Sequence, residues 1–193
     1  MKKTNGFTLI ELAVVLAIIA ILAAIMTPLV TGYIDEARVT RAAGDVRAIA
    51  TAVIAYQRDT ARFPIYSTIA YASSDTATVT DLVTDGDTPS AGTGSWTVGS
   101  SGDLNTYLNT NQLSLPTTSR GGRVRYSGPY IDLGSDPWGS AYVINADALT
   151  RTGITNHGFV VSAGPNLALD TTRDQVRTGS FTITGDDIVQ RIR

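Results

Sequence analysis

The stretch that decides the fold of this chain is residues 6–26, which read GFTLIELAVVLAIIAILAAIM. After Glu11, no charged residue follows until Asp35. A helix needs about 20 consecutive apolar residues to cross a bilayer, so this interval is long enough for a transmembrane helix. Lys2 and Lys3 precede it, and positive charge ahead of a span predicts a cytoplasmic N-terminus.

A secretory signal peptide is the alternative explanation of this stretch, because Ala20, Ala23 and Ala24 could supply the small residues of a cleavage site. Two features weigh against it. The apolar run continues into a helical pattern beyond Pro28, and Glu11 lies one turn into the run, where a carboxylate is unfavourable in lipid. Glu11 either reaches the headgroup region or pairs with a positive group inside an assembly.

Residues 31–58 continue the helical pattern but become amphipathic. Their apolar residues recur at steps of three and four, which is typical of one buried face on a helix. The stripe consists of Val39, Ala42, Ala43, Val46, Ile49, Ala50 and Val53. We expect one continuous helix from about Phe7 to about Arg58. A helix of roughly 75 Å cannot be buried in a small domain, so lipid or other copies of the chain must cover its first half.

The remaining residues, 59–193, predict a small globular head. Phe63-Pro64 marks the end of the helix, because the residue before a proline avoids helical geometry. Residues 67–102 predict a long loop, and Asp103–Asn111 predicts a short helix. Four segments predict strands: Arg123–Tyr126, Ser140–Asn145, Gly158–Ser162 and Ser180–Thr184. The expected fold class is α+β, in which the long helix packs on a small C-terminal antiparallel sheet.

Composition excludes several classes of function. The chain has a net charge of −2 and no cysteine, so disulfides and thiolate sites are excluded. The basic residues Arg120, Arg123 and Arg125 favour a solvated strand face over a nucleic-acid footprint, and no nucleic acid is expected as a partner. His157, the single histidine, could complete a triad with Ser162, but a lone histidine in a turn is more typical of a surface residue. No enzyme activity is predicted.

The segment Gly6-Phe7-Thr8-Leu9-Ile10-Glu11, followed by the apolar run to Ile25, closely resembles the N-terminal segment of type IV pilins and type II secretion pseudopilins. The resemblance implies that a prepilin peptidase cuts after Gly6 and methylates the new N-terminus at Phe7. It implies that Glu11 attracts the N-terminal ammonium of a neighbouring subunit. It also implies a helix-weakening proline, which Pro28 matches, since proline removes a backbone donor and loosens or kinks a helix.

The same resemblance divides the chain into four parts. Residues 1–6 would be a leader peptide, and residues 7–30 a transmembrane helix that becomes the core of a filament. Residues 31–58 would form the amphipathic half of that helix, and residues 59–193 a pilin-like head. The expected pilin fold combines the long helix with the antiparallel sheet.

Shorter segments of the head resemble the major pseudopilin of the type II secretion system. They are Tyr56–Pro64, Asp136–Tyr142, Val161–Asn166 and Gly185–Ile188. The chain departs from that pattern through an expanded middle loop and an insertion-like stretch from Thr171 to Gly185. These departures leave room for a true pilus subunit.

Four aspartates crowd the C-terminal loops: Asp170, Asp174, Asp186 and Asp187. Hard cations such as calcium take six to eight oxygen ligands, which loop carboxylates and carbonyls can supply. The family resemblance implies calcium in the last loop, with Asp186 and Asp187 as the best matched ligands. The alternative is that these aspartates form turns and are solvated.

The leading functional expectation is the repeating subunit of a helical filament, the major pseudopilin of a type II protein secretion system. The alternative is the major pilin of a type IV pilus for adhesion, motility or DNA uptake. A rival of another class is a monomeric membrane-anchored binding module. The implied partners are copies of the chain, the prepilin peptidase, an inner-membrane assembly platform, and minor pilins or pseudopilins. The implied location is the bacterial inner membrane, in a single pass, and then a periplasmic or extracellular filament.

Overall fold

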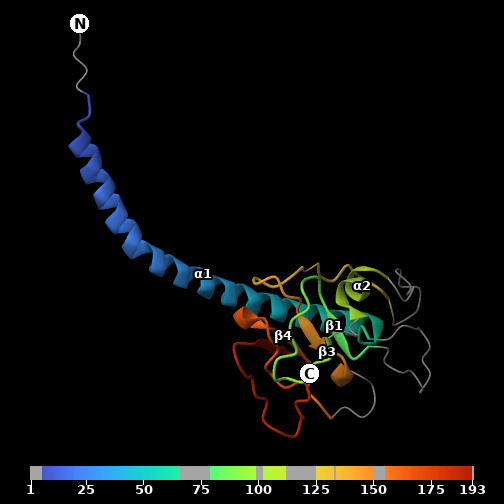
Figure 1. The fold of residues 1–193 in the computed structure, drawn as a ribbon. Coiled ribbons are helices and arrows are strands. Elements are labelled where there is room, and N and C mark those ends of the chain that lie inside the picture. Colours follow the sequence, from blue (N-terminus) through green and yellow to red (C-terminus); the bar gives the residue numbers. More distant parts are fainter. Residues whose placement is uncertain are drawn as a thin grey trace. The chain divides into compact units, whose positions relative to one another are not determined.

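The computed structural model describes residues 6–65, 79–98, 102–111, 125–132, 134–149 and 155–192. The chain divides into two compact units, Met1–Arg38 and Val39–Arg193. Figure 1 shows the long helix α1 and the small head that follows it in sequence.

Helix α1 runs from Leu9 to Thr60 and is 52 residues long. This confirms the predicted long helix to within two residues at each end. Its C-terminus is closed by Thr60, whose hydroxyl donates to the carbonyl of Tyr56 at 2.7 Å. The next residue, Ala61, has a φ of 57°, the left-handed geometry that commonly ends helices.

Pro28 lies inside α1, which is helical on both sides of it. Because proline has no N–H, the carbonyl four residues earlier loses its usual helical donor. Neighbouring threonines add side-chain donors here. The hydroxyl of Thr27 donates to the carbonyl of Ala23 at 2.8 Å, and that of Thr31 to the carbonyl of Pro28 at 3.0 Å. The loosening or kink expected at Pro28 stays a prediction.

The described residues of the head form a five-stranded sheet with the order β2-β1-β3-β4-β5. The strands are β1 (Asp81–Val83), β2 (Gly102–Asp103), β3 (Val143–Asn145), β4 (Phe159–Ser162) and β5 (Ile188–Arg191). Neighbouring strands pair antiparallel, as predicted, except that β1 and β2 are parallel. The sheet is therefore mixed rather than purely antiparallel.

The strand predictions were right in the middle of the sheet and wrong at its edges. The segments Ser140–Asn145 and Gly158–Ser162 contain β3 and β4. Ser180–Thr184 is not a strand; the last strand is β5, a few residues later. Of Arg123–Tyr126, the described residues Arg125 and Tyr126 are not in a strand, and the others lie outside the described residues. Of the predicted loop at 67–102, residues 67–78 and 99–101 lie outside the described residues. The described part contains β1, whose short sequence begins with a buried aspartate.

The sheet is covered on both faces, because successive side chains of a strand point to opposite sides. On one face, Ile144 and Val160 pack with residues of α1. On the other, Phe159 and Val161 pack with Trp96 from the middle loop. The α1 residues that are buried are Ala42, Val46, Ile49, Ala50, Ala52, Val53, Tyr56 and Thr60. The predicted stripe is confirmed except at its start, where Val39 is 43% exposed and Ala43 half-buried.

The short helix α2 (Leu104–Asn109) confirms the one predicted after Asp103. Asp103 is its N-cap and accepts a hydrogen bond from the N–H of Asn105 at 2.9 Å. Leu104, Tyr107 and Leu108 are buried in the same core as α1. Two short 3₁₀ turns, Asp147–Leu149 and Gly164–Asn166, complete the described elements.

Candidate functional site

The first unit presents an apolar helix surface with no cover from its own chain. Every described residue from Gly6 to Arg41 is exposed. Within the described residues, α1 is the helix that is long and apolar enough to cross a membrane, and the apolar window that qualifies it has no buried residue. A soluble domain does not leave so continuous an apolar surface in water, so this surface requires lipid or protein around it.

Glu11 and Thr8 form a reciprocal cap at the start of this helix. The carboxylate of Glu11 accepts hydrogen bonds from the N–H of Thr8 at 2.9 Å and from its hydroxyl at 2.7 Å. In return, the N–H of Glu11 donates to the hydroxyl oxygen of Thr8 at 3.3 Å. This is the capping-box arrangement, which satisfies backbone donors that a helix start otherwise leaves free.

The cap gives Glu11 a role that sequence reasoning missed. Thr8-Leu9-Ile10-Glu11 is a Thr-x-x-Glu pattern ahead of an apolar run, which is the known signal for such a cap. It could have been found from the sequence alone. The carboxylate thus has two local donors while remaining exposed, and it stays accessible to a further cationic partner.

The two residues of the expected processing site lie just ahead of α1. Gly6 and Phe7 precede the first helical residue, and both are exposed. A Cβ added at Gly6 would meet nothing within 4 Å, so the structure gives no packing reason for glycine there. Phe7 is 82% exposed. The backbone between them is therefore open to an enzyme, and its processing stays a prediction.

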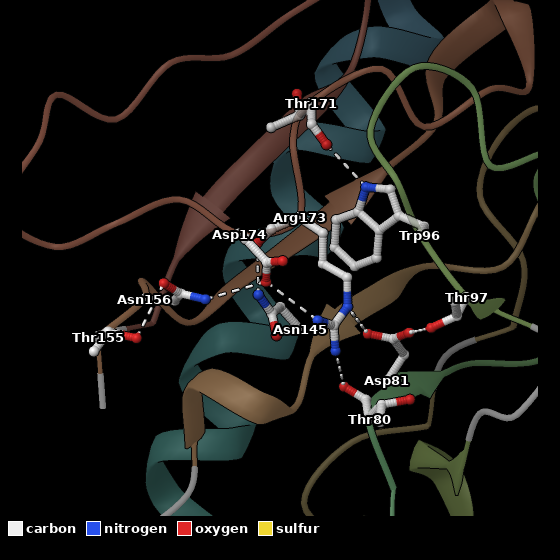
Figure 2. A network of polar contacts seen from close by, with 10 residues as sticks. All are labelled: Thr80, Asp81, Trp96, Thr97, Asn145, Thr155, Asn156, Thr171, Arg173 and Asp174. Atoms are coloured by element: carbon white, nitrogen blue, oxygen red, sulfur yellow. Dashed lines mark hydrogen bonds and ion pairs between the residues drawn. The ribbon is translucent and has the colours of Figure 1, made fainter. Parts of the chain in front are cut away.

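Of the four aspartates, Asp174 lies apart in a different set of contacts. Its carboxylate accepts from the side-chain amide of Asn156 at 3.1 Å and pairs with Arg173 at 3.2 Å. Figure 2 shows it beside these two residues. Its partners are a cation and an amide, so Asp174 is a poor candidate for a metal ligand.

Two of the other three aspartates, Asp170 and Asp186, are linked through Asn166. The N–H of Asn166 donates to Asp186 at 3.0 Å, and its side-chain amide donates to Asp170 at 3.0 Å. A Cβ built on Gly185 would lie 2.6 Å from Asp170 Oδ2, so the Asp170 carboxylate touches the backbone just before Asp186. Gly185 also has a φ of +71°, which favours glycine at this turn.

Asp187 is the buried member of this group. It is 7% exposed and accepts a hydrogen bond from the N–H of Thr171. Burial raises the pKa of its carboxyl above the usual range, and the charge of Asp170 acts in the same direction. Asp187 Oδ1 and Asp186 Oδ1 are buried without a hydrogen-bond partner.

Asp186 and Asp187 each present one buried carboxylate oxygen without a hydrogen-bond donor, the kind of atom that a hard cation binds. Buried carboxylate oxygens without donors are costly, and calcium takes such oxygens together with backbone carbonyls. Within the described part of the chain, no three acidic or histidine side chains converge as a ready metal site. The residues that fit are therefore Asp186 and Asp187, with Asp170 alongside.

A second polar network, centred on Arg173, holds the middle loop to the C-terminal loops (Figure 2). Arg173 donates to Asp81 at 2.9 Å and to the carbonyl of Thr80 at 3.0 Å. The carbonyl of Arg173 in turn accepts from Asn145 at 2.7 Å. Asp81 is fully buried, so this pair is structural.

The residues weighed for catalysis have other partners. The hydroxyl of Ser162 donates to Asp136 at 2.7 Å, and Ser162 is fully buried. Nδ1 of His157 lies 3.0 Å from the guanidinium of Arg191. Since Ser162 is engaged by a carboxylate rather than by a histidine base, these residues do not form a nucleophilic triad.

Comparison with known proteins gives matches to part of the chain. Residues 1–27 match the family model of the prokaryotic N-terminal methylation motif. The chain is 46% identical over 63 residues to the type II secretion system core protein G of Pseudomonas aeruginosa, covering 33% of this chain and 44% of that protein. No solved structure gives a significant match.

Fimbrial relatives match at a similar level. A fimbrial protein of Pseudomonas aeruginosa is 54% identical over 52 residues, covering 27% of this chain and 34% of the relative. The type IV major alpha-pilin of Moraxella bovis is 51% identical over 53 residues, covering 28% and 33%. The alignments span less than half the length of each relative. Over the matched third or less of its length, the chain is therefore similar to type IV pilins and to the type II secretion system core protein G.

Proposed function

We propose that this chain is the repeating subunit of a helical pilus-like filament, and that the filament is the pseudopilus of a type II protein secretion system. The observation that carries the proposal is the exposed apolar surface of α1, with the capped carboxylate of Glu11 at its start. The role is structural, and no chemical reaction is assigned to the chain.

The apolar surface supports two environments in succession. Its length suits a bilayer before assembly. Its apolar residues face all around the helix, a pattern typical of a helix that is surrounded on every side. Packing against copies of the same helix would bury the surface again after the chain leaves the membrane.

Glu11 supports a specific contact within such a bundle. Cleavage after Gly6 would create an ammonium group at Phe7, and opposite charges attract strongly in a low-dielectric surrounding. We infer that the ammonium of one subunit meets the Glu11 carboxylate of the next. Thr8 would hold that carboxylate in place until the contact forms.

Relatives support both kinds of filament, so the pilus remains the second candidate. Identity to the secretion core protein G extends over more residues, 63 against 52 and 53 for the fimbrial relatives. The fimbrial relatives are the more identical over their shorter match, and they favour a type IV pilus for adhesion, motility or DNA uptake.

The proposal carries partners and a location with it. A prepilin peptidase would process the segment at Gly6 and Phe7, in line with the methylation motif at 1–27. Before assembly, the chain would reside in the inner membrane with a cytoplasmic N-terminus. An assembly platform in that membrane, together with minor pilins or pseudopilins, would then build it into a periplasmic or extracellular filament.

Calcium is a further part of the proposal. Asp186 and Asp187 would hold it, with Asp170 alongside, and the buried unpaired oxygens of the pair support this. The ion would supply positive charge that offsets the desolvation of these carboxylates. Calcium should then raise the melting temperature of the head and a chelator should lower it. A melting temperature unchanged by both would rule the ion out.

The central experiment is complementation of a deletion strain with Glu11→Gln. Export and filaments seen by electron microscopy should both be lost, while Glu36→Gln, an exposed acid further along α1, should restore both. Long surface fibres with normal export in the parent would favour the pilus instead. If Glu11→Gln behaves like the parent and no filament forms in either, the chain is a monomeric membrane-anchored binding module.

A further inference from the structure

Residues 90–96 of the middle loop, which we call the strap, lie along the segment 167–173 that carries Asp170. Backbone hydrogen bonds join the two segments repeatedly. They are Ser90 N to Leu167 O at 3.0 Å, Leu169 N to Ser90 O at 3.0 Å, Gly94 N to Leu169 O at 3.0 Å, and Arg173 N to Gly94 O at 2.9 Å. Such a ladder fixes the strap at a defined register against the acidic segment.

Two glycines let the strap approach closely. A Cβ on Gly92 would lie 2.5 Å from the carbonyl oxygen of Leu169 and 2.9 Å from Asp170 Oδ1, and Gly92 has a φ of +50°. A Cβ on Gly94 would collide with the carbonyl oxygen of Thr171. Any other residue at these positions would push the strap away.

Thr93, at the centre of the strap, holds the carboxylate of Asp170. Its N–H donates to Asp170 Oδ1 at 3.3 Å, and its hydroxyl lies 3.2 Å from both Asp170 Oδ1 and the Asp170 carbonyl oxygen. The other carboxylate oxygen, Oδ2, accepts from Asn166 and faces Gly185. Donors on both sides therefore fix which oxygen of Asp170 faces the loop of Asp186 and Asp187.

Thr171 connects the strap to the buried acid. Its carbonyl accepts from the indole Nε1 of Trp96 at 2.8 Å, and its N–H donates to Asp187. Figure 2 shows the indole reaching this carbonyl. Trp96 also packs edge-on against Phe159, with ring centroids 5.6 Å apart. A shift of the Thr171 backbone would disturb Trp96 and Asp187 together.

We propose that Thr93 is a positioning residue of the cation site and that docking of the strap is coupled to calcium binding. The inference rests on the proposed calcium site. Residues that orient a ligand without touching the ion commonly change affinity by about 10- to 100-fold. Coupling between two equilibria is reciprocal, so calcium should also tighten the strap.

The test is calcium titration of the full chain in detergent by isothermal calorimetry. Thr93→Val, which lacks the hydroxyl donor, should weaken calcium binding about 10-fold. Thr93→Ser, which keeps the donor, should stay within about twofold of the parent. The matched control is Thr97→Val, because Thr97 contacts Asp81 rather than Asp170, and it should also leave the affinity unchanged.

A second readout follows the strap itself. In a Trp138→Phe background, Trp96 is the single tryptophan, and its fluorescence should change with calcium at the same midpoint as the calorimetry. Equal affinity of Thr93→Val and the parent would overturn the inference, as would equal losses in Thr93→Val and Thr97→Val. Trp96 fluorescence that does not change with calcium would overturn the coupling between calcium binding and docking of the strap. A parent that binds no calcium would overturn both this inference and the calcium site, but not the filament.

Discussion

The two halves of α1 have the same backbone conformation and opposite surroundings. No described side chain before Ala42 is buried, whereas the second half places a stripe of side chains in the core of the head. The first half is apolar all around, and the second half is apolar on one face only. The difference shows that helix formation and burial are separate properties: the pattern around the helix decides what it needs as a partner.

The largest loss of stability is expected when the buried ion pair of Arg173 and Asp81 in the second unit is broken. The described part of the first unit has no buried ion pair. Arg173→Met leaves Asp81 charged and buried, which should destabilise the head by about 3–5 kcal/mol. Urea unfolding of the full chain in detergent measures this. Arg177→Met, at an exposed arginine nearby, is the control. Adding Asp81→Leu to Arg173→Met should recover part of the loss, and no recovery would contradict the explanation.

A pair of isoleucines tests the contrast between the two halves of α1 directly. Ile49 is fully buried, so Ile49→Ala should destabilise the head by about 3 kcal/mol. Ile18 is exposed in the first half, so Ile18→Ala should leave unfolding of the head unchanged. The same unfolding experiment reports on both. An equal loss of unfolding free energy in the two variants would mean that both halves of α1 contribute to the core of the head.

A smaller effect is expected at the start of α1, where the cap is local. Thr8→Val removes the hydroxyl that Glu11 and Thr8 share. Amide hydrogen exchange at Glu11 and Leu12 should become about fivefold faster, the usual consequence of losing a cap. Unfolding of the head should not change. Thr31→Val, which keeps the cap, is the control; faster exchange in both variants would point to general fraying instead.

The smallest effect is a gain in the stability of the calcium-free head when Asp187 is replaced. Burial raises the pKa of its carboxyl in the folded state above the ordinary aspartate value. Its contribution to stability is therefore full below the unfolded pKa and is lost as the pH rises through the folded pKa. Asp187→Asn should stabilise the calcium-free head at pH 7, because the variant buries no charge there.

This gain should vanish near pH 3, where the aspartate is protonated in both states. Thermal melts of parent and variant at both pH values, with chelator present, give the comparison. Asp174→Asn, at an exposed aspartate, is the matched control. A variant less stable than the parent at pH 7 would show that the aspartate charge is favourable even without calcium.

Much of the fold followed from periodicity. The span, the amphipathic half and the two central strands were predictable because each is a continuous pattern of apolar residues. The edges of the sheet were not. β1 and β2 contain few residues and include aspartates, and β5 is only partly buried, so neither composition nor alternation marks them as strands.

The candidate functional sites also divide into residues that the sequence predicts and residues that only the fold brings together. Gly6, Phe7 and Glu11 lie close together in one local motif, so the sequence places them. The four aspartates form one group in the sequence, but Asp174 turns away to Arg173 and Asn156. Thr93 lies 77 positions from Asp170 along the chain, and no local pattern connects them.

The sequence alone determined that this chain has a helix too long and too apolar to be covered by its own head. Hydrophobic periodicity is a local property, so it survives without knowledge of the fold. Only the tertiary structure decided which loops meet: that the strap lies on the acidic segment, that Arg173 pairs with Asp81, and that Asp187 is buried. These contacts join residues far apart in sequence, and the closure of long loops depends on the packing of the whole head.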